Sequence, residues 1–179
     1  MTNKEIMNIA MQQSAYDLNA NASDFLQDTN VFAVAGIGPL ARKCYKEPIA
    51  CNLVSYGNNI VVSVKEEFKE IIETYLNKFE FYHCFETPNM HWLDTRMKEH
   101  GYRVCFMADY FLPDINHLRR KECDFELKVL EHQDFENLYL PEWSNALCED
   151  RKELDVLGVG AFDGNKLVGL AACSADCES

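Results

Sequence analysis

Basic residues are scarce in this sequence. It has 17 Lys and Arg against 29 Asp and Glu, a formal net charge of −12 at pH 7, and its one basic cluster is Arg119-Arg120-Lys121. Most of such a surface repels phosphate backbones, so we expect no nucleic-acid binding. The same acidity suits a cationic acceptor such as an amine or polyamine, although it is also the usual charge of a bacterial-type cytosolic protein.

Long apolar runs are missing as well. No stretch approaches the ~20 residues that a membrane span requires. The first residues, MTNKEIMNIAMQQS, mix charge into their apolar positions, which is unlike a signal peptide. We therefore expect no membrane partner and a cytoplasmic location. The 179 residues suffice for one domain with a sizeable core or for two small ones.

The eight cysteines lack the spacing of metal ligands. None forms a C-x-x-C pair, and no pair of histidines at ligand spacing stands beside them, so no zinc site is expected. Most lie in apolar runs such as 104–106 and 146–148, a pattern that predicts small buried hydrophobes rather than disulfides. The five histidines are scattered, and nothing in the sequence suggests a catalytic triad.

Helical patterns recur in the first two thirds of the chain. A capping box at 2–5 predicts a helix with Ile6, Ile9, Ala10 and Leu18 on one face. A second capping box at 63–66 precedes apolar residues at helical spacing over 68–79. Pro88 begins a third predicted helix, which Gly101 ends.

Strand patterns separate these helices. Segments 50–56 and 60–64 flank Gly57-Asn58-Asn59, which predicts a hairpin. Segments 80–85 and 102–112 are also predicted strands. Hairpin, helix, strand, helix and strand then follow in order.

Gly36, Gly38 and Ala41 formally match the dinucleotide fingerprint G-x-G-x-x-A. Pro48 leaves the following helix too short to cross back over a sheet, and no acidic residue stands about twenty positions further on to hold a ribose. No regular βαβ pattern surrounds the motif. We interpret it as a loop that leads into a short helix.

The strongest local signal lies at 156–172. Two apolar runs flank Asp163-Gly164-Asn165, where a tight turn requires positive φ, and this predicts a hairpin. Because the hairpin is apolar along most of its length, we expect cover on both faces. Upstream, the pattern predicts a strand at 124–130, a helix at 133–140, a break at Pro141 and a second helix through Cys148.

These C-terminal segments resemble the front half of a GNAT superfamily N-acetyltransferase. The likeness rests on residues 125–127, the PEWSNALC block at 141–148, and residues 154–161 and 167–170, roughly the last third of the chain. It implies transfer of an acetyl group from acetyl-CoA to an amine. In the family's reaction a base takes the amine proton, the amine attacks the thioester, and backbone donors steady the oxyanion.

The resemblance also implies an acceptor pocket at the turn between the first helices of the fold. Glu142 is expected to hold or deprotonate an ammonium group, Trp143 to wall the pocket and Asn145 to orient the acceptor. The alternative is a helix break with a capping Ser or Asn and a tryptophan in the core. The catalytic residues stay unknown.

The family's cofactor loop has no counterpart in the sequence. That loop, Q/R-x-x-G-x-G/A, holds the CoA pyrophosphate with backbone N–H groups at a helix N-terminus. No Arg or Gln precedes Gly158, Gly160, Gly164 or Gly169 at the required offset. Acetyl-CoA is the cofactor of the complete family fold, but we expect none to bind this chain tightly and expect the chain alone to be inactive.

We predict an α/β chain with an α+β mixed sheet and two domains. Residues 1–121 form an N-terminal α/β lobe, interpreted as degenerate and acetyltransferase-like because its element order matches the back half of a GNAT fold. Residues 122–179 form a partial GNAT-like domain, truncated after its hairpin, and the charged run 119–122 links the two. The alternative function is a non-enzymatic ligand-binding or regulatory module that dimerises through its open sheet edge.

Overall fold

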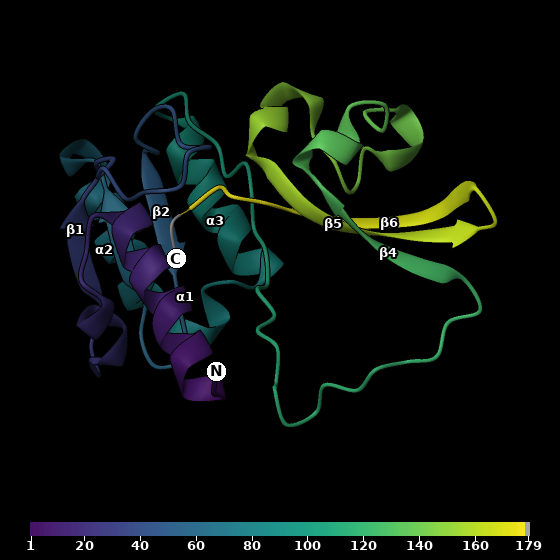
Figure 1. Cartoon of the computed structure of the whole chain (residues 1–179). Coiled ribbons are helices and arrows are strands. Elements are labelled where there is room, and N and C mark those ends of the chain that lie inside the picture. Colours follow the sequence, from purple (N-terminus) through teal and green to yellow (C-terminus); the bar gives the residue numbers. More distant parts are fainter. Residues whose placement is uncertain (178–179) are drawn as a thin grey trace. The chain divides into compact units, whose positions relative to one another are not determined.

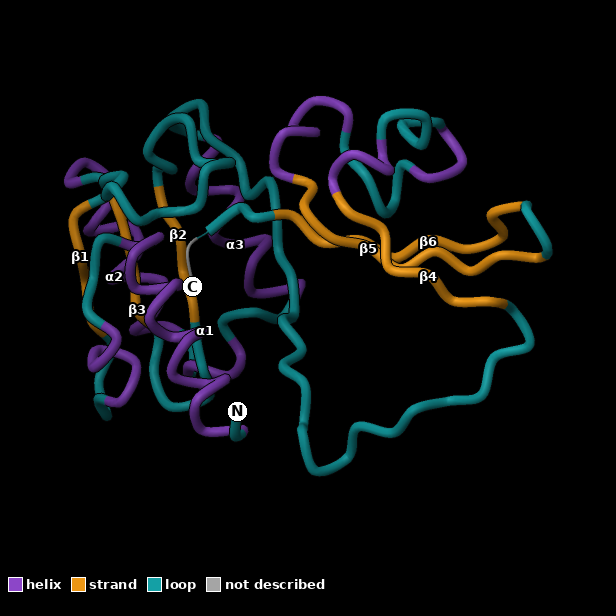
Figure 2. Tube along the Cα trace, viewed as in Figure 1, coloured by secondary structure: helices purple, strands orange, loops and turns teal. Residues whose placement is uncertain are grey.

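The computed structural model describes residues 1–177, which divide into two compact units. Unit 1 spans Met1–Leu118 and unit 2 covers residues 119–177, a division that lies just before the boundary expected after Lys121. Each unit has a three-stranded sheet and helical segments (Figures 1 and 2). The chain is therefore α+β.

The sheet of unit 1 has the strand order β1-β3-β2. β3 (Val61–Val64) runs parallel to β1 (Val31–Val34) and antiparallel to β2 (Cys51–Val54). β2 and β3 are the hairpin that the sequence predicts, and Gly57 in the connection has φ +97°. A side chain is strained at that angle, which explains the glycine.

Helices cover both faces of this sheet. Because side chains alternate along a strand, Val61 packs with Met11, Ala15 and Leu18 of α1 (Asn3–Leu18). Val62 and Val64 point to the opposite face, against α2 (Lys69–Lys78) and α3 (Thr87–Lys98). All four residues of β3 are buried, so this central strand carries two cores.

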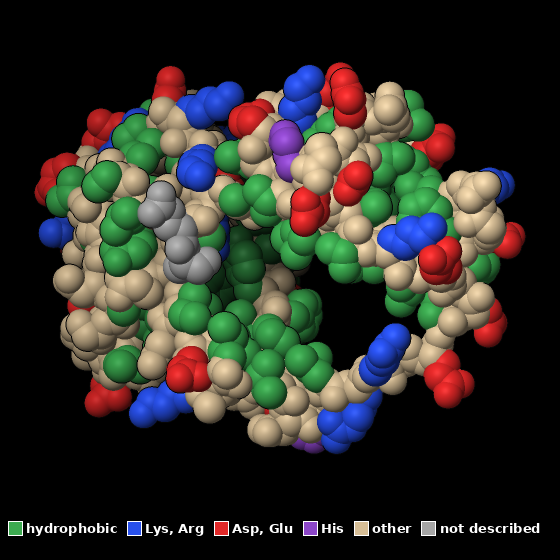
Figure 3. Space-filling view, in the orientation of Figure 1, with side chains coloured by type: hydrophobic (Ala, Val, Ile, Leu, Met, Phe, Trp, Pro, Cys, Tyr) green, Lys and Arg blue, Asp and Glu red, His purple; other side chains and the backbone are tan. Residues whose placement is uncertain are grey.

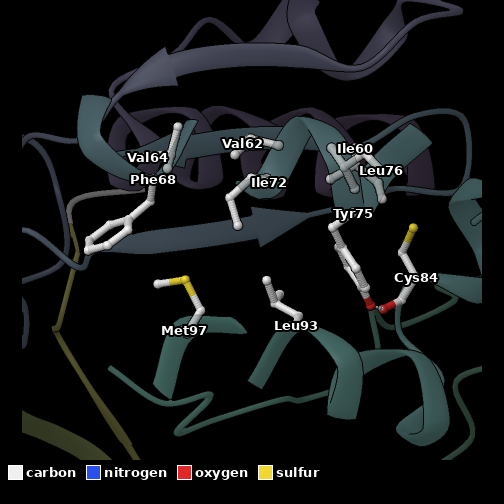
Figure 4. Close-up of a cluster of buried hydrophobic side chains, with 10 residues drawn as sticks. All are labelled: Ile60, Val62, Val64, Phe68, Ile72, Tyr75, Leu76, Cys84, Leu93 and Met97. Atoms are coloured by element: carbon white, nitrogen blue, oxygen red, sulfur yellow. Dashed lines mark hydrogen bonds between the residues drawn. The ribbon is translucent and has the colours of Figure 1, made fainter. Parts of the chain in front are cut away.

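The larger core lies between the sheet and the pair α2 and α3 (Figure 4). Ile72 is fully buried, and Leu93 and Met97 approach it from α3. Tyr75 is 1% exposed, and its hydroxyl donates a hydrogen bond to the carbonyl of Cys84. The bond satisfies the one polar atom that this side chain brings into an apolar site.

The capping box of α1 is confirmed. The Thr2 hydroxyl accepts from the Glu5 N–H, and the Glu5 carboxylate accepts from the Thr2 N–H at 2.6 Å. The predicted apolar face is only partly correct, since Ile9 is 40% exposed. The second predicted capping box is wrong. A 3₁₀ turn, η2 (Glu66–Phe68), comes before α2, and the residue that precedes this turn, Lys65, makes no side-chain capping bond.

Two predicted strands of unit 1 are wrong. Residues 80–85 contain the 3₁₀ turn η3 (Phe81–His83), whose local bonds, such as the His83 N–H to the Glu80 carbonyl at 2.8 Å, occupy the backbone. Residues 102–112 are irregular, and Asp94 of α3 accepts the Val104 N–H at 2.9 Å. The element order that suggested a degenerate acetyltransferase-like lobe lacks both of these strands.

Unit 2 is built on an antiparallel meander. β4 (Glu126–Glu131), β5 (Asp155–Asp163) and β6 (Lys166–Ser174) lie side by side in chain order. The predicted hairpin is confirmed, with Gly164 at φ +59° in its turn.

The two helices predicted between β4 and β5 are wrong. Three 3₁₀ turns occur instead: η4 (His132–Phe135), η5 (Pro141–Trp143) and η6 (Glu149–Leu154). Pro141 has no N–H to continue a helix, and bonds of the tighter i to i+3 type, such as Leu138 N–H to Phe135 carbonyl at 2.8 Å, replace the α pattern.

The sheet of unit 2 is covered on one face. Leu130 packs there with Phe135 and Leu147, together with partly buried Phe162, Leu170 and Ala172. The opposite face presents apolar side chains that stay exposed: Leu127 (50%), Val129 (67%), Leu157 (47%) and Val159 (42%). The expectation of cover on both faces is wrong for the described residues, because no second layer lies over this face within the unit.

Charges of both signs are interspersed on the face of the molecule in Figure 3, with apolar side chains also reaching the surface. None of the described helices combines the length and the apolar character that crossing a bilayer requires.

Candidate functional site

The three predicted acceptor residues lie on one short turn of unit 2. Glu142 and Trp143 belong to η5, and Asn145 follows two residues later. Glu142 and Asn145 are exposed, whereas Trp143 is half-buried and lies outside the core around Phe135. The turn therefore offers a carboxylate, an amide and a partly exposed indole on the surface.

Backbone bonds hold this turn in shape. The Trp143 N–H donates to the Leu140 carbonyl at 2.9 Å, and the Trp143 carbonyl accepts from Ala146 at 2.9 Å and Leu147 at 3.0 Å. Leu147 is 4% exposed and anchors the end of the turn in the core. Glu142, Trp143 and Asn145 thus lie on a loop that backbone hydrogen bonds and a core contact hold in place.

Asp155, at the start of β5, ties the whole loop to the sheet. Its side chain is 1% exposed, and among the described residues no Lys, Arg or His donates a hydrogen bond to its carboxylate. Oδ1 accepts from the Ser174 hydroxyl at 2.6 Å, and Oδ2 accepts from the Cys148 N–H at 3.2 Å. The Tyr139 hydroxyl, 3.3 Å from Oδ2 and 3.2 Å from the Lys152 carbonyl, shares its proton between these two acceptors. One carboxylate therefore connects β6 with both ends of the segment 139–148, which carries Glu142, Trp143 and Asn145.

Tyr139 and His132 complete the surroundings of Asp155. Burial, and then the charge of Asp155, raise the pKa of the Tyr139 phenol, so it stays a donor at neutral pH. The backbone carbonyl of Asp155 accepts from His132 Nδ1 at 2.7 Å. Since a carbonyl only accepts, this bond places the proton of a neutral His132 on Nδ1 and leaves Nε2 as the basic nitrogen.

Sequence reasoning missed Asp155, Tyr139 and Ser174. The available signal was a charged residue directly before an apolar strand, in the segment LDVLGVGAF. A carboxylate at such a position is buried with the strand and requires several donors. His132 is exposed, but its hydrogen bond to the Asp155 carbonyl orients it.

Acetyl-CoA, which the resemblance implies, does not fit the described residues of unit 2. These residues form no α-helix whose N-terminus could receive a pyrophosphate. The strand glycines serve packing: a Cβ at Gly158 would lie 3.2 Å from the Phe135 ring, and one at Gly160 would lie 2.7 Å from the Phe162 ring. They therefore make room for aromatic rings and do not cradle a phosphate.

The G-x-G-x-x-A segment of unit 1 is a loop, as expected. The short helix expected after it is absent, and turns take its place. The Asp17 carboxylate, 3% exposed, holds this loop on α1 by accepting from the Arg42 guanidinium at 2.6 Å and the Arg42 N–H at 2.9 Å. A cavity of about 10 Å³ beside Gly36 and Ile37 has room for one water at most. It offers no dinucleotide site.

Among residues 1–177, no three His, Cys, Asp or Glu side chains gather in a group that could hold a metal ion. The prediction that most cysteines are buried is wrong. Cys84 is buried, whereas Cys105, Cys123 and Cys173 are exposed. Cys105 lies on the irregular segment that was predicted as a strand, and Cys173 lies on the uncovered face of the unit 2 sheet.

Comparisons of the chain with protein-family models, with curated proteins and with solved structures found no match.

Proposed function

We propose that unit 2 is the acceptor side of a GNAT-type N-acetyltransferase, which binds the amine that receives the acetyl group. The observation that carries the proposal is the order of elements: a strand, helical turns with PEWSNALC, and an antiparallel hairpin. The family likeness assigns the acceptor pocket to the turn that holds Glu142, Trp143 and Asn145.

The chemistry of the turn suits a cationic amine. Glu142, Glu149 and Asp150 are acidic and exposed, and no Lys or Arg lies between Pro141 and Asp150. Glu142 holds the ammonium group or takes its proton, Trp143 supplies an apolar wall, and Asn145 fixes orientation. Asp155 positions the turn without contacting the amine, since it is buried and occupied by protein donors.

Trp143 fluorescence tests this proposal. The chain has two tryptophans, so Trp92→Phe leaves Trp143 as the sole reporter, and titration with primary amines should change its emission saturably. Glu142→Gln should weaken binding about fivefold, the scale of one exposed charge pair. Glu136→Gln, a matched exposed change on the same unit, should leave it unaltered. Equal weakening by both variants would indicate attraction to net charge only.

Isothermal titration with acetyl-CoA addresses the cofactor separately. Because the described residues form no pyrophosphate site in unit 2, we expect no tight binding to the 179-residue chain. Tight binding of acetyl-CoA would overturn this expectation. The proposed amine-binding role of the turn is tested by the fluorescence titration and does not depend on this result.

A second candidate is a binding or regulatory module that dimerises through β6. The outer edge of this nine-residue strand pairs with no other strand among the described residues, and Lys166 is its only charged residue. Long, apolar edges of this kind pair with other chains. Light scattering should then report a dimer, and Ala171→Lys, an exposed change on β6, should give a monomer. A monomeric parent chain would refute this candidate.

A further inference from the structure

Unit 1 contains an extended segment without a strand partner. Residues 102–114, drawn as loop in Figure 2, have neither a turn nor a bend, and no N–H group of residues 105–112 donates to a backbone carbonyl in the described structure. Hydrogen bonds fix both ends. The Val104 N–H donates to Asp94 of α3 at 2.9 Å, and the Asn3 amide of α1 donates to Asp114 at 2.7 Å. Between these anchors the backbone groups of a β-strand are present but make no strand pairing.

Large apolar side chains of this segment are exposed. Phe106 is 73% exposed, Tyr110 71% and Phe111 91%. Contiguous exposed apolar side chains of this size mark interaction surfaces. A strand segment with unpaired backbone groups is also a template for pairing with another chain. The segment therefore has both the side chains and the backbone of an interaction strand.

The bond from Val104 to Asp94 decides which edge of the segment is open. Successive residues of an extended chain direct their N–H groups to opposite edges. The even-numbered residues from 104 to 108 therefore direct theirs to the edge where Asp94 lies, and the odd-numbered residues from 103 to 109 direct theirs to the other edge. A strand that pairs with this open edge forms its hydrogen bonds with the odd-numbered residues.

This open edge is complementary to itself in one antiparallel register. When Phe106 lies opposite the same residue of a second copy, Arg103 lies opposite Asp109 and Cys105 lies opposite Met107. The two-fold axis repeats each pair, as in any interface between two identical surfaces. All of the paired positions are odd-numbered except Phe106 on the axis, so the hydrogen-bonding residues are those of the open edge.

The two charges of the segment select this register. Arg103 and Asp109 are exposed, and neither has an ion-pair partner among the described residues. Asp94, which lies near Arg103, is already paired with Lys98 at 2.6 Å. Registers shifted by two residues place Arg103 opposite residue 107 or 111, both apolar, and leave its charge unpaired. Opposite charges that face each other across strands stabilise a sheet, so the register centred on Phe106 is favoured.

We propose that residues 103–109 pair antiparallel with the same segment of a second copy of this chain. Arg103 and Asp109 form an ion pair at each end of the ladder, and the two Phe106 side chains contact each other at its centre. The interface lies within unit 1 of each copy, and it does not depend on acyl transfer or amine binding by unit 2.

Analytical ultracentrifugation of the full chain tests the proposal. The parent chain should show a reversible equilibrium between monomer and dimer at micromolar concentrations. Arg103→Asp and Asp109→Arg each place like charges opposite each other twice, so each should weaken the dimer about tenfold or more. The two changes combined exchange the charges and should restore the affinity to within about threefold of the parent chain.

Net charge is controlled by the opposite signs of these changes. If general repulsion between acidic chains governed association, Asp109→Arg would strengthen the dimer while Arg103→Asp weakened it. The proposed register predicts that both weaken it. Arg120→Asp, an exposed change outside the segment that alters the net charge as Arg103→Asp does, should leave the affinity unchanged. All of these positions are exposed, and recovery in the combined variant excludes unfolding as the cause of the loss.

Disulfide trapping tests the register. Phe106→Cys brings two thiols together at a pair whose Cα atoms lie about 4.5 Å apart, which is within disulfide range. Mild oxidation should therefore cross-link this variant. Ala108→Cys lies opposite Val104 and not opposite its own copy, so it should cross-link at least fivefold more slowly. Both variants are made in a background in which the exposed native cysteines are serine: Cys44, Cys105, Cys123 and Cys173.

Four results would overturn the proposal: a parent chain that stays monomeric, opposite effects of the two single charge reversals, no recovery in the combined variant, or equal cross-linking at positions 106 and 108. If Ala171→Lys abolishes association and Arg103→Asp does not, the dimer forms through β6 and the proposal is wrong. Since the proposed function is read from Trp143 in unit 2, either proposal can fail without the other.

Discussion

Removing the Asp155 carboxylate should loosen the loop that carries Glu142, Trp143 and Asn145. In Asp155→Ala, the Cys148 N–H and the Ser174 hydroxyl lose their acceptor in a site that is 1% exposed. A buried donor left without a partner costs about 1–3 kcal/mol, and the Ser174 hydroxyl can rotate to find another. We therefore expect the free energy of unfolding of unit 2 to fall by about 3 kcal/mol, which includes the space that the side chain leaves.

Asp155→Asn removes the negative charge at this position but keeps a side-chain oxygen that can accept a hydrogen bond. The amide can keep its oxygen toward the Cys148 N–H and turn its NH₂ toward Ser174, whose hydroxyl is able to accept. This variant should lose only about 1 kcal/mol, because the neutral bonds are weaker than charge-assisted ones while the buried charge is removed.

Urea denaturation followed by Trp143 fluorescence, in a Trp92→Phe background, measures unit 2 directly. Asp163→Asn, a carboxylate change at the exposed end of β5, is the control and should cost less than about 0.5 kcal/mol. If Asp155→Ala unfolds at the same urea concentration as the parent chain, Asp155 does not hold the loop. If the Ala and Asn variants lose equal stability, the negative charge of Asp155 stabilises unit 2 and its hydrogen-bond acceptor alone does not.

Tyr75→Phe should cost unit 1 about 1–2 kcal/mol, measured by urea denaturation with Trp92 fluorescence, because the Cys84 carbonyl loses its donor; an unchanged midpoint would refute this. Unit 1 should also lose stability at high pH. Burial raises the pKa of Cys51 from 9.0 to about 12 and raises that of Tyr75 above its ordinary 10.0. The unfolded chain therefore releases these protons first, and stability falls by roughly 1–2 kcal/mol between about pH 9 and pH 11. A flat profile in pH-resolved urea titrations would contradict it. Gly158→Ala should destabilise unit 2 by about 1–3 kcal/mol in thermal melts, since its Cβ would lie 3.0 Å from a backbone oxygen of β6. Gly169→Ala, whose Cβ would make only an ordinary 3.5 Å contact, should change little.

Local signals in the sequence predicted the elements whose causes are local. The Thr2–Glu5 capping box, the glycine turns at Gly57 and Gly164, and the helical period of α2 each depend on residues a few positions apart. Turn geometry and capping act at that range, so the sequence was enough for these features.

Elements that depend on contacts with distant parts of the chain were not predicted correctly. Residues 102–112 have a strand pattern, yet no neighbouring strand pairs with them in the described structure, and Asp94 takes the Val104 N–H instead. The predicted helices around Pro141 become 3₁₀ turns because the loop is held by Asp155 and by the core contact of Leu147. A strand or helix of this kind requires tertiary contacts that no local pattern contains.

The candidate sites divide in the same way. The sequence alone was enough to predict the acidic charge, the two hairpins, the α+β class and a turn that carries Glu142, Trp143 and Asn145. Composition and short-range patterns specify these features. Only the tertiary structure revealed the Asp155 network, whose members Tyr139, Cys148 and Ser174 come from three segments. Burial and the pairing of polar atoms are properties of the folded surroundings and not of any one residue.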